Sequence, residues 1–143
     1  MTLIQKSVTI NAPVENVLAI LEDPERQSDL NPNLKLRSHR PSPLGFFDTQ
    51  WEYKMAGMKL SGESTVTAYE RGKRIVFESK GGIDSRWEWT ITAEASTTRV
   101  ALALTYTMPG SLLGAALNKL VIEGQNEKDI EGQLANLKRL SER

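Results

Sequence analysis

Cysteine is absent from this chain of 143 residues, and histidine occurs once. Without thiols the chain cannot form disulfides, thiolate zinc sites, iron–sulfur clusters or a cysteine nucleophile. A Ser-His-Asp triad or a histidine-based metal site would depend on His39, which lies between two arginines near a predicted strand end and which we interpret as a surface residue. The H-E-x-x-H, P-loop and G-x-G-x-x-G motifs are also missing. The sequence therefore predicts no metal site and no cofactor.

An excess of either charge is missing as well. Lysine plus arginine and aspartate plus glutamate both total 18, so no basic surplus is available to follow a phosphate backbone, and we expect no nucleic-acid partner. No stretch approaches the ~20 apolar residues of a membrane span, and the opening MTLIQKSVTI lacks the apolar run of a signal peptide. We expect one soluble, cytoplasmic domain over residues 1–143 with a sizeable core.

The first 30 residues predict a strand followed by two helices. Residues 2–10 are rich in β-forming side chains, and the next segment repeats apolar residues at helical spacing, at Val14, Val17, Leu18 and Leu21. Pro13 suits the first helical position, and Pro24 disfavours helix in the residue before it, so this helix should end by Asp23. Residues 24–30 can then form a second short helix.

From residue 34 onward the hydrophobic period changes to two, which predicts strands. Six segments separated by short turns show this alternation: residues 34–40, 46–55, 60–70, 75–79, 85–94 and 99–108. Such a series is typical of an antiparallel meander with one apolar face. Residues 111–142 read as one long helix, which we expect to cover that face.

Aromatic residues concentrate on the predicted inner face of the sheet. Trp87 and Trp89 are two positions apart in SRWEWTITAE and so point the same way. Trp51, Tyr53 and Tyr106 share the inward parity of their strands. Core packing is the usual role of such residues, and the wall of a ligand cavity is the alternative.

The long helix carries carboxylates in an unexpected place. Continuing the apolar stripe of its C-terminal half toward the N-terminus leads through Glu127 and Glu123. Either the helix bends near Gly124, or it is continuous and the two glutamates face a solvated space, because a close-packed core would exclude them. We favour a bend, with the glutamates near water at a cavity mouth.

The order and spacing of several motifs resemble the START-like superfamily. SVTINAPVENVLAILEDPERQSDLNPNL is similar to its opening strand and A-P-x-E-x-V helix, here Ala12, Pro13, Glu15 and Val17. ITAEASTTRVALALTYTM and LANLKRLSE are similar to its last strand pair and final helix. The resemblance covers the whole chain, although Leu30 stands where many relatives have tryptophan.

This resemblance implies an α+β helix-grip fold with the order strand, two helices, six strands and helix, in which a curved antiparallel sheet wraps around the C-terminal helix. It also implies an apolar cavity for a small hydrophobic ligand such as a lipid, polyketide or quinone. It implies no shared catalytic residues. On this basis the candidate ligand-binding residues are Trp51, Tyr53, Met55, Ser64, Trp87, Trp89, Leu104, Tyr106, Leu113, Leu117 and Leu120.

Two other functions remain open. An enzyme of the cyclase or dehydratase kind would need an acid or base in the pocket, for which the candidates are Glu123, Glu127, Tyr53 and Tyr106. Strand parity sends most other charged side chains outward, so we rank this function second. An accessory protein could instead contact a membrane, a larger complex or a second copy through the apolar residues 112–122, which could equally form a gate or a buried helix start.

Overall fold

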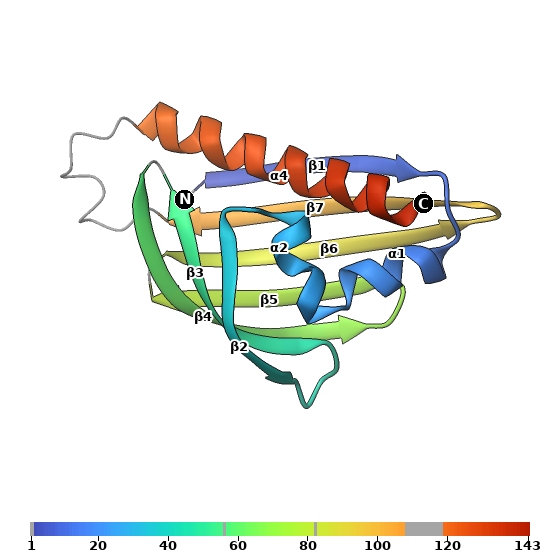
Figure 1. Cartoon of the computed structure of the whole chain (residues 1–143), viewed down its shortest axis with the longest axis horizontal. Coiled ribbons are helices and arrows are strands. Elements are labelled where there is room, and N and C mark those ends of the chain that lie inside the picture. The colour runs from blue at the N-terminus through green and yellow to red at the C-terminus, as the bar shows by residue number, and fades with distance from the viewer. Residues whose placement is uncertain (1, 56, 82, 108–118) are drawn as a thin grey trace.

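A computed structural model describes residues 2–55, 57–81, 83–107 and 119–143 of the chain (Figure 1). The predicted order of strand, two helices, six strands and helix is confirmed. The strands are β1 (Thr2–Ile10), β2 (Leu34–Pro41), β3 (Phe47–Met55), β4 (Met58–Glu70), β5 (Arg74–Gly81), β6 (Asp84–Glu94) and β7 (Thr97–Thr107). The helices are α1 (Val14–Leu21), a 3-10 turn η1 (Pro24–Arg26), α2 (Gln27–Leu30) and α4 (Lys119–Ser141).

All seven strands form one antiparallel sheet in the order β1-β7-β6-β5-β4-β3-β2. The sheet is strongly curved and stays open, because β1 and β2 are its two edges and do not pair with each other. In Figure 1 the helix α4 lies along β1, with α1 and α2 on the same side of the sheet. The three helices therefore cover the concave face, as the apolar parity of the strands predicts.

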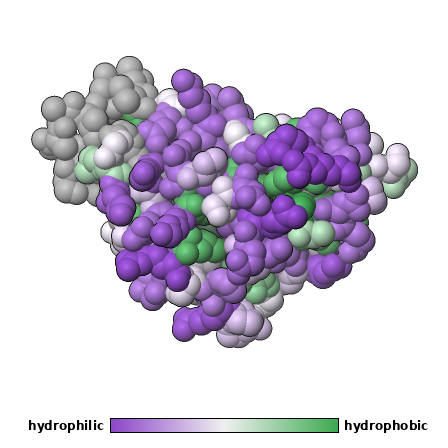
Figure 2. Space-filling view, in the orientation of Figure 1, coloured by the Kyte–Doolittle hydropathy of each residue, from purple (hydrophilic) through white to green (hydrophobic). Residues whose placement is uncertain are grey.

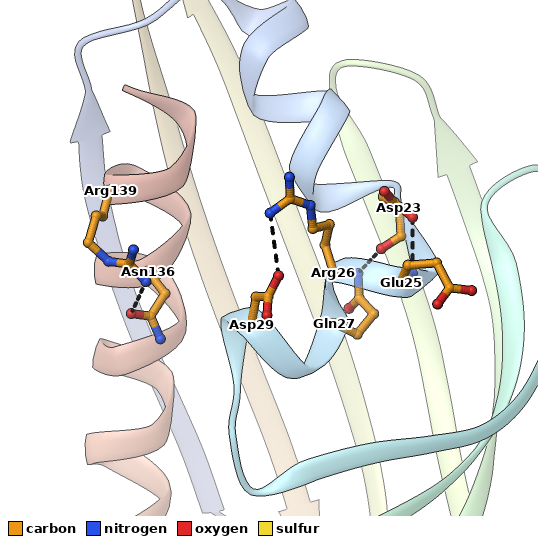
Figure 3. Close-up of polar contacts among 7 residues, drawn as sticks. All are labelled: Asp23, Glu25, Arg26, Gln27, Asp29, Asn136 and Arg139. Carbon is orange, nitrogen blue, oxygen red and sulfur yellow. Dashed lines mark hydrogen bonds and ion pairs between the residues drawn. The ribbon is translucent and has the colours of Figure 1, made fainter. Parts of the chain in front are cut away.

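The turn between α1 and α2 is held by its own side chains (Figure 3). Asp23 accepts a hydrogen bond from the backbone N–H of Glu25 at 3.0 Å, as an N-terminal cap does. The Gln27 amide donates to the carbonyl oxygens of Leu21 and Asp23, both at 3.1 Å. Because these bonds satisfy carbonyls at the end of α1, the turn fixes α2 beside α4 and brings Gln27 to the concave face.

The close-packed part of the core lies under the C-terminal half of α4. There Leu137 and Ile130 pack with α1 and with the β6–β7 end of the sheet, and both are fully buried. Other fully buried members are Ile10, Val17, Leu21, Ile75, Val100 and Leu102. Toward the other end of the sheet this packing gives way to a cavity, described below.

The inward face of α4 differs from the predicted one. The helix runs without interruption through Gly124, and four-residue steps carry its buried stripe from Leu134 through Ile130 and Asn126 to Ile122. The predicted course through Glu127 and Glu123 is therefore wrong, and so is the bend. The signal failed because the inward face carries a polar residue, Asn126, where it borders the cavity between the buried Ile130 and Ile122.

The two glutamates instead face the edge strand β1. The Lys6 ammonium donates to Glu127 at 2.8 Å, and the Thr2 hydroxyl donates to Glu123 at 3.3 Å. Half of the Glu127 side chain is exposed. These residues therefore join α4 to β1 from outside the cavity. Within the described ranges no helix is long and apolar enough to cross a membrane.

Candidate ligand-binding cavity

The cavity lies between the concave sheet and the middle of α4, from Asn126 to Gln133, and its lining includes Gln27 from α2 and Tyr53 from β3. The space that the centre of a water molecule can occupy inside it is about 100 Å³. One water needs about 10–15 Å³ of such space, so the cavity has room for several water molecules or a small ligand. In Figure 2, hydrophobic residues are visible between hydrophilic neighbours near the middle of the face that carries α4, α2 and β3. The interior is thus not filled by its own side chains.

Most of the predicted lining residues are brought together here. The described walls include Trp51, Tyr53, Ser64, Trp87, Trp89, Leu104 and Tyr106. The side chains of Met55 and Leu120 are not among those described, and Leu113 and Leu117 lie outside the described residues. The predicted contact segment 112–122 lies outside them up to residue 118, so its role stays a prediction.

One end of the cavity is shaped by an indole lying on glycine. A Cβ added to Gly62 would lie 2.6 Å from the Trp51 ring and 2.3 Å from the carbonyl oxygen of Lys80. Gly81, whose φ is +115°, lies against Gly62 on the neighbouring strand. Because Gly62 has no side chain, the Trp51 ring can lie against β4, and because Gly81 has none, β5 can approach the backbone of Gly62 closely. The glycines therefore set the position of this wall.

A second wall is a stack of aromatic rings on β5 and β6. Phe77 and Trp87 stack with centroids 5.9 Å apart and planes inclined by 14°. Phe46 stacks on Phe77 from the β2–β3 turn, at 6.3 Å. The indole N–H of Trp87 donates to the Ser85 hydroxyl at 3.1 Å, which fixes the ring orientation. This wall offers a flat apolar surface to a ring-shaped ligand.

Two polar groups in the lining have no partner among the described residues. The Tyr106 hydroxyl and the Trp51 indole N–H are buried, and neither is hydrogen-bonded to any other part of the chain that the structure describes. A buried donor without an acceptor costs free energy. A bound molecule carrying acceptor atoms would remove that cost. Both groups are therefore unsatisfied donors in the wall of the cavity.

One ionisable group also faces the cavity, and sequence reasoning missed it. Asp129 on α4 accepts hydrogen bonds from the Tyr53 hydroxyl and, at 3.2 Å, from the Asn33 amide. Burial raises the pKa of Asp129 to about 6, and the Asn33 hydrogen bond partly offsets that rise. The residue was missed because the predicted helix face was rotated toward Glu127. Its position next to Ile130 in the observed stripe was the available signal.

Of the predicted acid–base candidates, the structure places Tyr53 and Tyr106 in the cavity and Glu123 and Glu127 outside it. On the helix side the cavity is bordered instead by Asn126 and Gln133, whose side chains are buried. His39 is exposed on β2, 3.5 Å from Glu25, as predicted for a surface residue. The arrangement can hold an apolar molecule and can offer it one acid and several hydrogen bonds.

Comparisons with known proteins agree with this geometry. The profile of the family described as "Polyketide cyclase / dehydrase and lipid transport" matches residues 1–142. No curated protein sequence matches the chain. Among solved structures, a protein from Thermus thermophilus is 23% identical, with a TM-score of 0.75 over 98% of this chain and 97% of its own.

Two further structures are similar over the whole chain. A protein from Deinococcus radiodurans is 24% identical, with a TM-score of 0.67 over 99% of this chain and 98% of its own. The Zhui aromatase/cyclase from Streptomyces sp. R1128 is 16% identical, with a TM-score of 0.77 over 99% of this chain and 94% of its own. At these identities the similarity establishes the shared fold.

Proposed function

We propose that this chain, which belongs to the polyketide cyclase/dehydrase and lipid transport family, binds a small hydrophobic ligand in the cavity beneath α4. The observation that carries the proposal is a cavity lined by aromatic residues, in whose wall the Tyr106 hydroxyl is buried with no partner among the described residues. In an apolar core that binds no ligand, that hydroxyl group would lower the stability of the fold, because an unpaired buried donor costs free energy.

Burial of apolar surface would supply most of the affinity. Each Å² of ligand and wall removed from water contributes roughly 25 cal/mol, and a preformed cavity lowers the ordering cost of binding. All three tryptophans of the chain line the cavity, and indoles bury more area than any other side chain. The ligand is therefore expected to be largely apolar and to owe its orientation to a few polar contacts.

A cavity-filling substitution tests this proposal. Asn126 faces the cavity from α4 and is 3% exposed, whereas Lys128 is exposed on the same helix. Asn126→Phe should weaken binding of the neutral fluorescent probe N-phenyl-1-naphthylamine at least tenfold, because the new ring occupies the space of the probe. Lys128→Phe is the matched control and should bind as the unsubstituted chain does. Failure of the unsubstituted chain to bind the probe, or equal binding by both variants, would contradict the proposal.

A second candidate function is an acid–base enzyme of the cyclase or dehydratase kind, and Asp129 is the observation that favours it. A carboxyl group with a pKa of about 6 is mostly ionised at pH 7 and can accept a proton from carbon next to a carbonyl group. The Tyr53 hydroxyl donates to this carboxylate and would orient it. The enzyme hypothesis therefore rests on Asp129 and Tyr53 in place of Glu123 and Glu127.

The two functions are separated by one variant. Asp129→Asn should leave probe binding within about threefold of the unsubstituted chain, because the amide keeps the size of the carboxylate and can still accept from Tyr53. With a synthetic poly-β-ketone as substrate, the enzyme hypothesis predicts turnover by the unsubstituted chain and its loss in Asp129→Asn. Turnover that survives the substitution, or that does not occur in either protein, would leave ligand binding as the function.

A further inference from the structure

Five hydroxyl groups form a single row across the floor of the cavity. In the register of the sheet Thr49 pairs with Ser64, Ser64 with Ser79, Ser79 with Ser85, and Ser85 with Tyr106. The row thus crosses five adjacent strands from β3 to β7, and each member lines the cavity. We call these five residues the hydroxyl row.

Most protons of the hydroxyl row have no acceptor in the described structure. The Ser64 and Ser79 hydroxyls lie 2.5 Å apart, so one donates to the other and the second proton of that pair stays free. The Ser85 oxygen accepts from Trp87, which leaves the Ser85 proton available. The Tyr106 hydroxyl has no partner in the part of the chain that the structure describes. A hydroxyl supplies one donor, so the row offers at least three O–H groups to a bound molecule.

Alanine at the serine positions of the hydroxyl row would leave the same space at a lower cost in free energy. Small residues on β4, β5 and β6 are needed to leave the cavity empty, but a methyl group would do so without burying a polar atom. Ser64 and Ser79 are 7% and 4% exposed. The presence of hydroxyls at consecutive positions of one row therefore points to contacts that only a ligand would complete.

An apolar row runs beside the polar one. Two residues away along each strand, Phe77 pairs with Trp87 and Trp87 with Leu104 on the same face of the sheet. Strand geometry places the two rows about 7 Å apart. A flat ring can therefore lie over Phe77 and Trp87 while its edge reaches the hydroxyls. A saturated chain would cover the aromatic row and leave the hydroxyls unpaired.

We propose that the hydroxyl row determines specificity by selecting ring-containing ligands that carry oxygen atoms side by side along one edge, in preference to acyl chains. This inference rests on the proposed ligand-binding function and goes beyond it, because it assigns selection among hydrophobic ligands to five named residues. Tyr106 contributes a donor that has no partner in the described chain.

Two isomeric probes test the hydroxyl row. 1,8-Dihydroxyanthraquinone carries three oxygens side by side on one edge, whereas 2,6-dihydroxyanthraquinone has the same formula and apolar area with its hydroxyls at the two ends. Isothermal titration calorimetry should show the 1,8-isomer binding about 5- to 20-fold more tightly, as expected for one or two additional hydrogen bonds. Tyr106→Phe and the double variant Ser64→Ala/Ser79→Ala should reduce that ratio to about one.

Matched controls separate recognition from folding. Tyr69 donates its hydroxyl to Glu22 outside the cavity, and Ser61 is exposed on β4, so Tyr69→Phe and Ser61→Ala should keep the isomer preference. Thermal denaturation without ligand should show Tyr106→Phe to be at least as stable as the unsubstituted chain, because an unpaired hydroxyl is removed. A purely structural role would instead lower the stability and leave the preference unchanged.

The results of these experiments are distinguishable. Equal binding of the isomers by the unsubstituted chain, or a preference that survives in Tyr106→Phe and in the double serine variant, would overturn the inference. If N-phenyl-1-naphthylamine still binds in that case, the proposed ligand-binding function stands. If it does not bind either, both the inference and the proposed function fail.

Discussion

The Tyr53 hydroxyl donates a hydrogen bond to the Asp129 carboxylate and so joins β3 to α4 at the cavity. The same carboxylate accepts from Asn33, on the connection between α2 and β2. Three elements that are far apart in the sequence therefore meet at one ionisable group. This contact fixes the distance between sheet and helix, and it also gives the cavity its acid.

The first prediction concerns the ionisation of Asp129. Its carboxyl pKa should be close to 6 in the folded chain, because burial disfavours the charged form. Asn33→Ala and Tyr53→Phe should each raise the pKa further, since each removes a donor that stabilises the carboxylate. Carbon-13 NMR titration of the side-chain carboxyl group measures this directly. A pKa near the ordinary 3.8 would show that the site is well solvated.

The second prediction follows from the sign of that shift. The pKa of Asp129 is higher in the folded chain than its ordinary value, so between pH 4 and 6 the folded state holds a proton that the unfolded state releases. The contribution of Asp129 to the free energy of unfolding is therefore complete below about pH 4 and is lost as the pH rises toward 6. Urea denaturation across this range should show a weaker loss of stability in Asp129→Asn. Parallel pH profiles for the two proteins would refute this assignment.

The third prediction compares two glycine substitutions. Gly62→Ala should destabilise the fold by about 2 kcal/mol or more, because the new methyl group would meet the Lys80 carbonyl and the Trp51 ring. Gly124→Ala should stabilise it by about 0.5–1 kcal/mol, since the exposed helical position has open space around it. Both values come from urea denaturation. Similar effects of the two substitutions would mean that Trp51 does not lie on Gly62.

The fourth prediction concerns the glutamates of α4. Because Glu127 bonds to Lys6 and Glu123 to Thr2, outside the cavity, Glu123→Gln and Glu127→Gln should not change the affinity for N-phenyl-1-naphthylamine. The melting temperature should change by a few degrees at most, as is usual for exposed ion pairs. Fluorescence titration and thermal denaturation provide the two readouts. A marked loss of affinity in either variant would show that the substituted glutamate contributes to the binding site.

The fold could be predicted largely because the alternation of apolar and polar residues is an unambiguous signal for strands. From residue 47 to residue 107 the inward parity of Trp51, Trp87 and Tyr106 agrees with the structure, and so does the order of elements. The ends of the strands differ by a few residues, as with β4, which begins at Met58 and not at Leu60. One-residue irregularities, such as the register shift between Val66 and Ala68, carry no signal in the hydrophobic pattern.

The cavity side of α4 could not be predicted in the same way. Hydrophobic periodicity locates a helix face where that face packs against a core, as it does at Leu134 and Leu137. Where the helix borders the cavity, the inward residues include Asn126 and Asp129, which the pattern reads as solvent-facing. The hydroxyl row was likewise only partly visible, since Ser64 and Ser85 have inward parity but their alignment with Ser79 depends on strand register.

The central claim is that the space beneath α4 receives an apolar ligand against the indole rings. Nuclear Overhauser effects in a complex with N-phenyl-1-naphthylamine test it most directly, because all three tryptophans of the chain line that space. We expect binding of one probe per chain, with contacts between the probe and the ring protons of Trp87 and Trp89. Saturable binding without any contact to a tryptophan ring, or no binding at all, would contradict the claim.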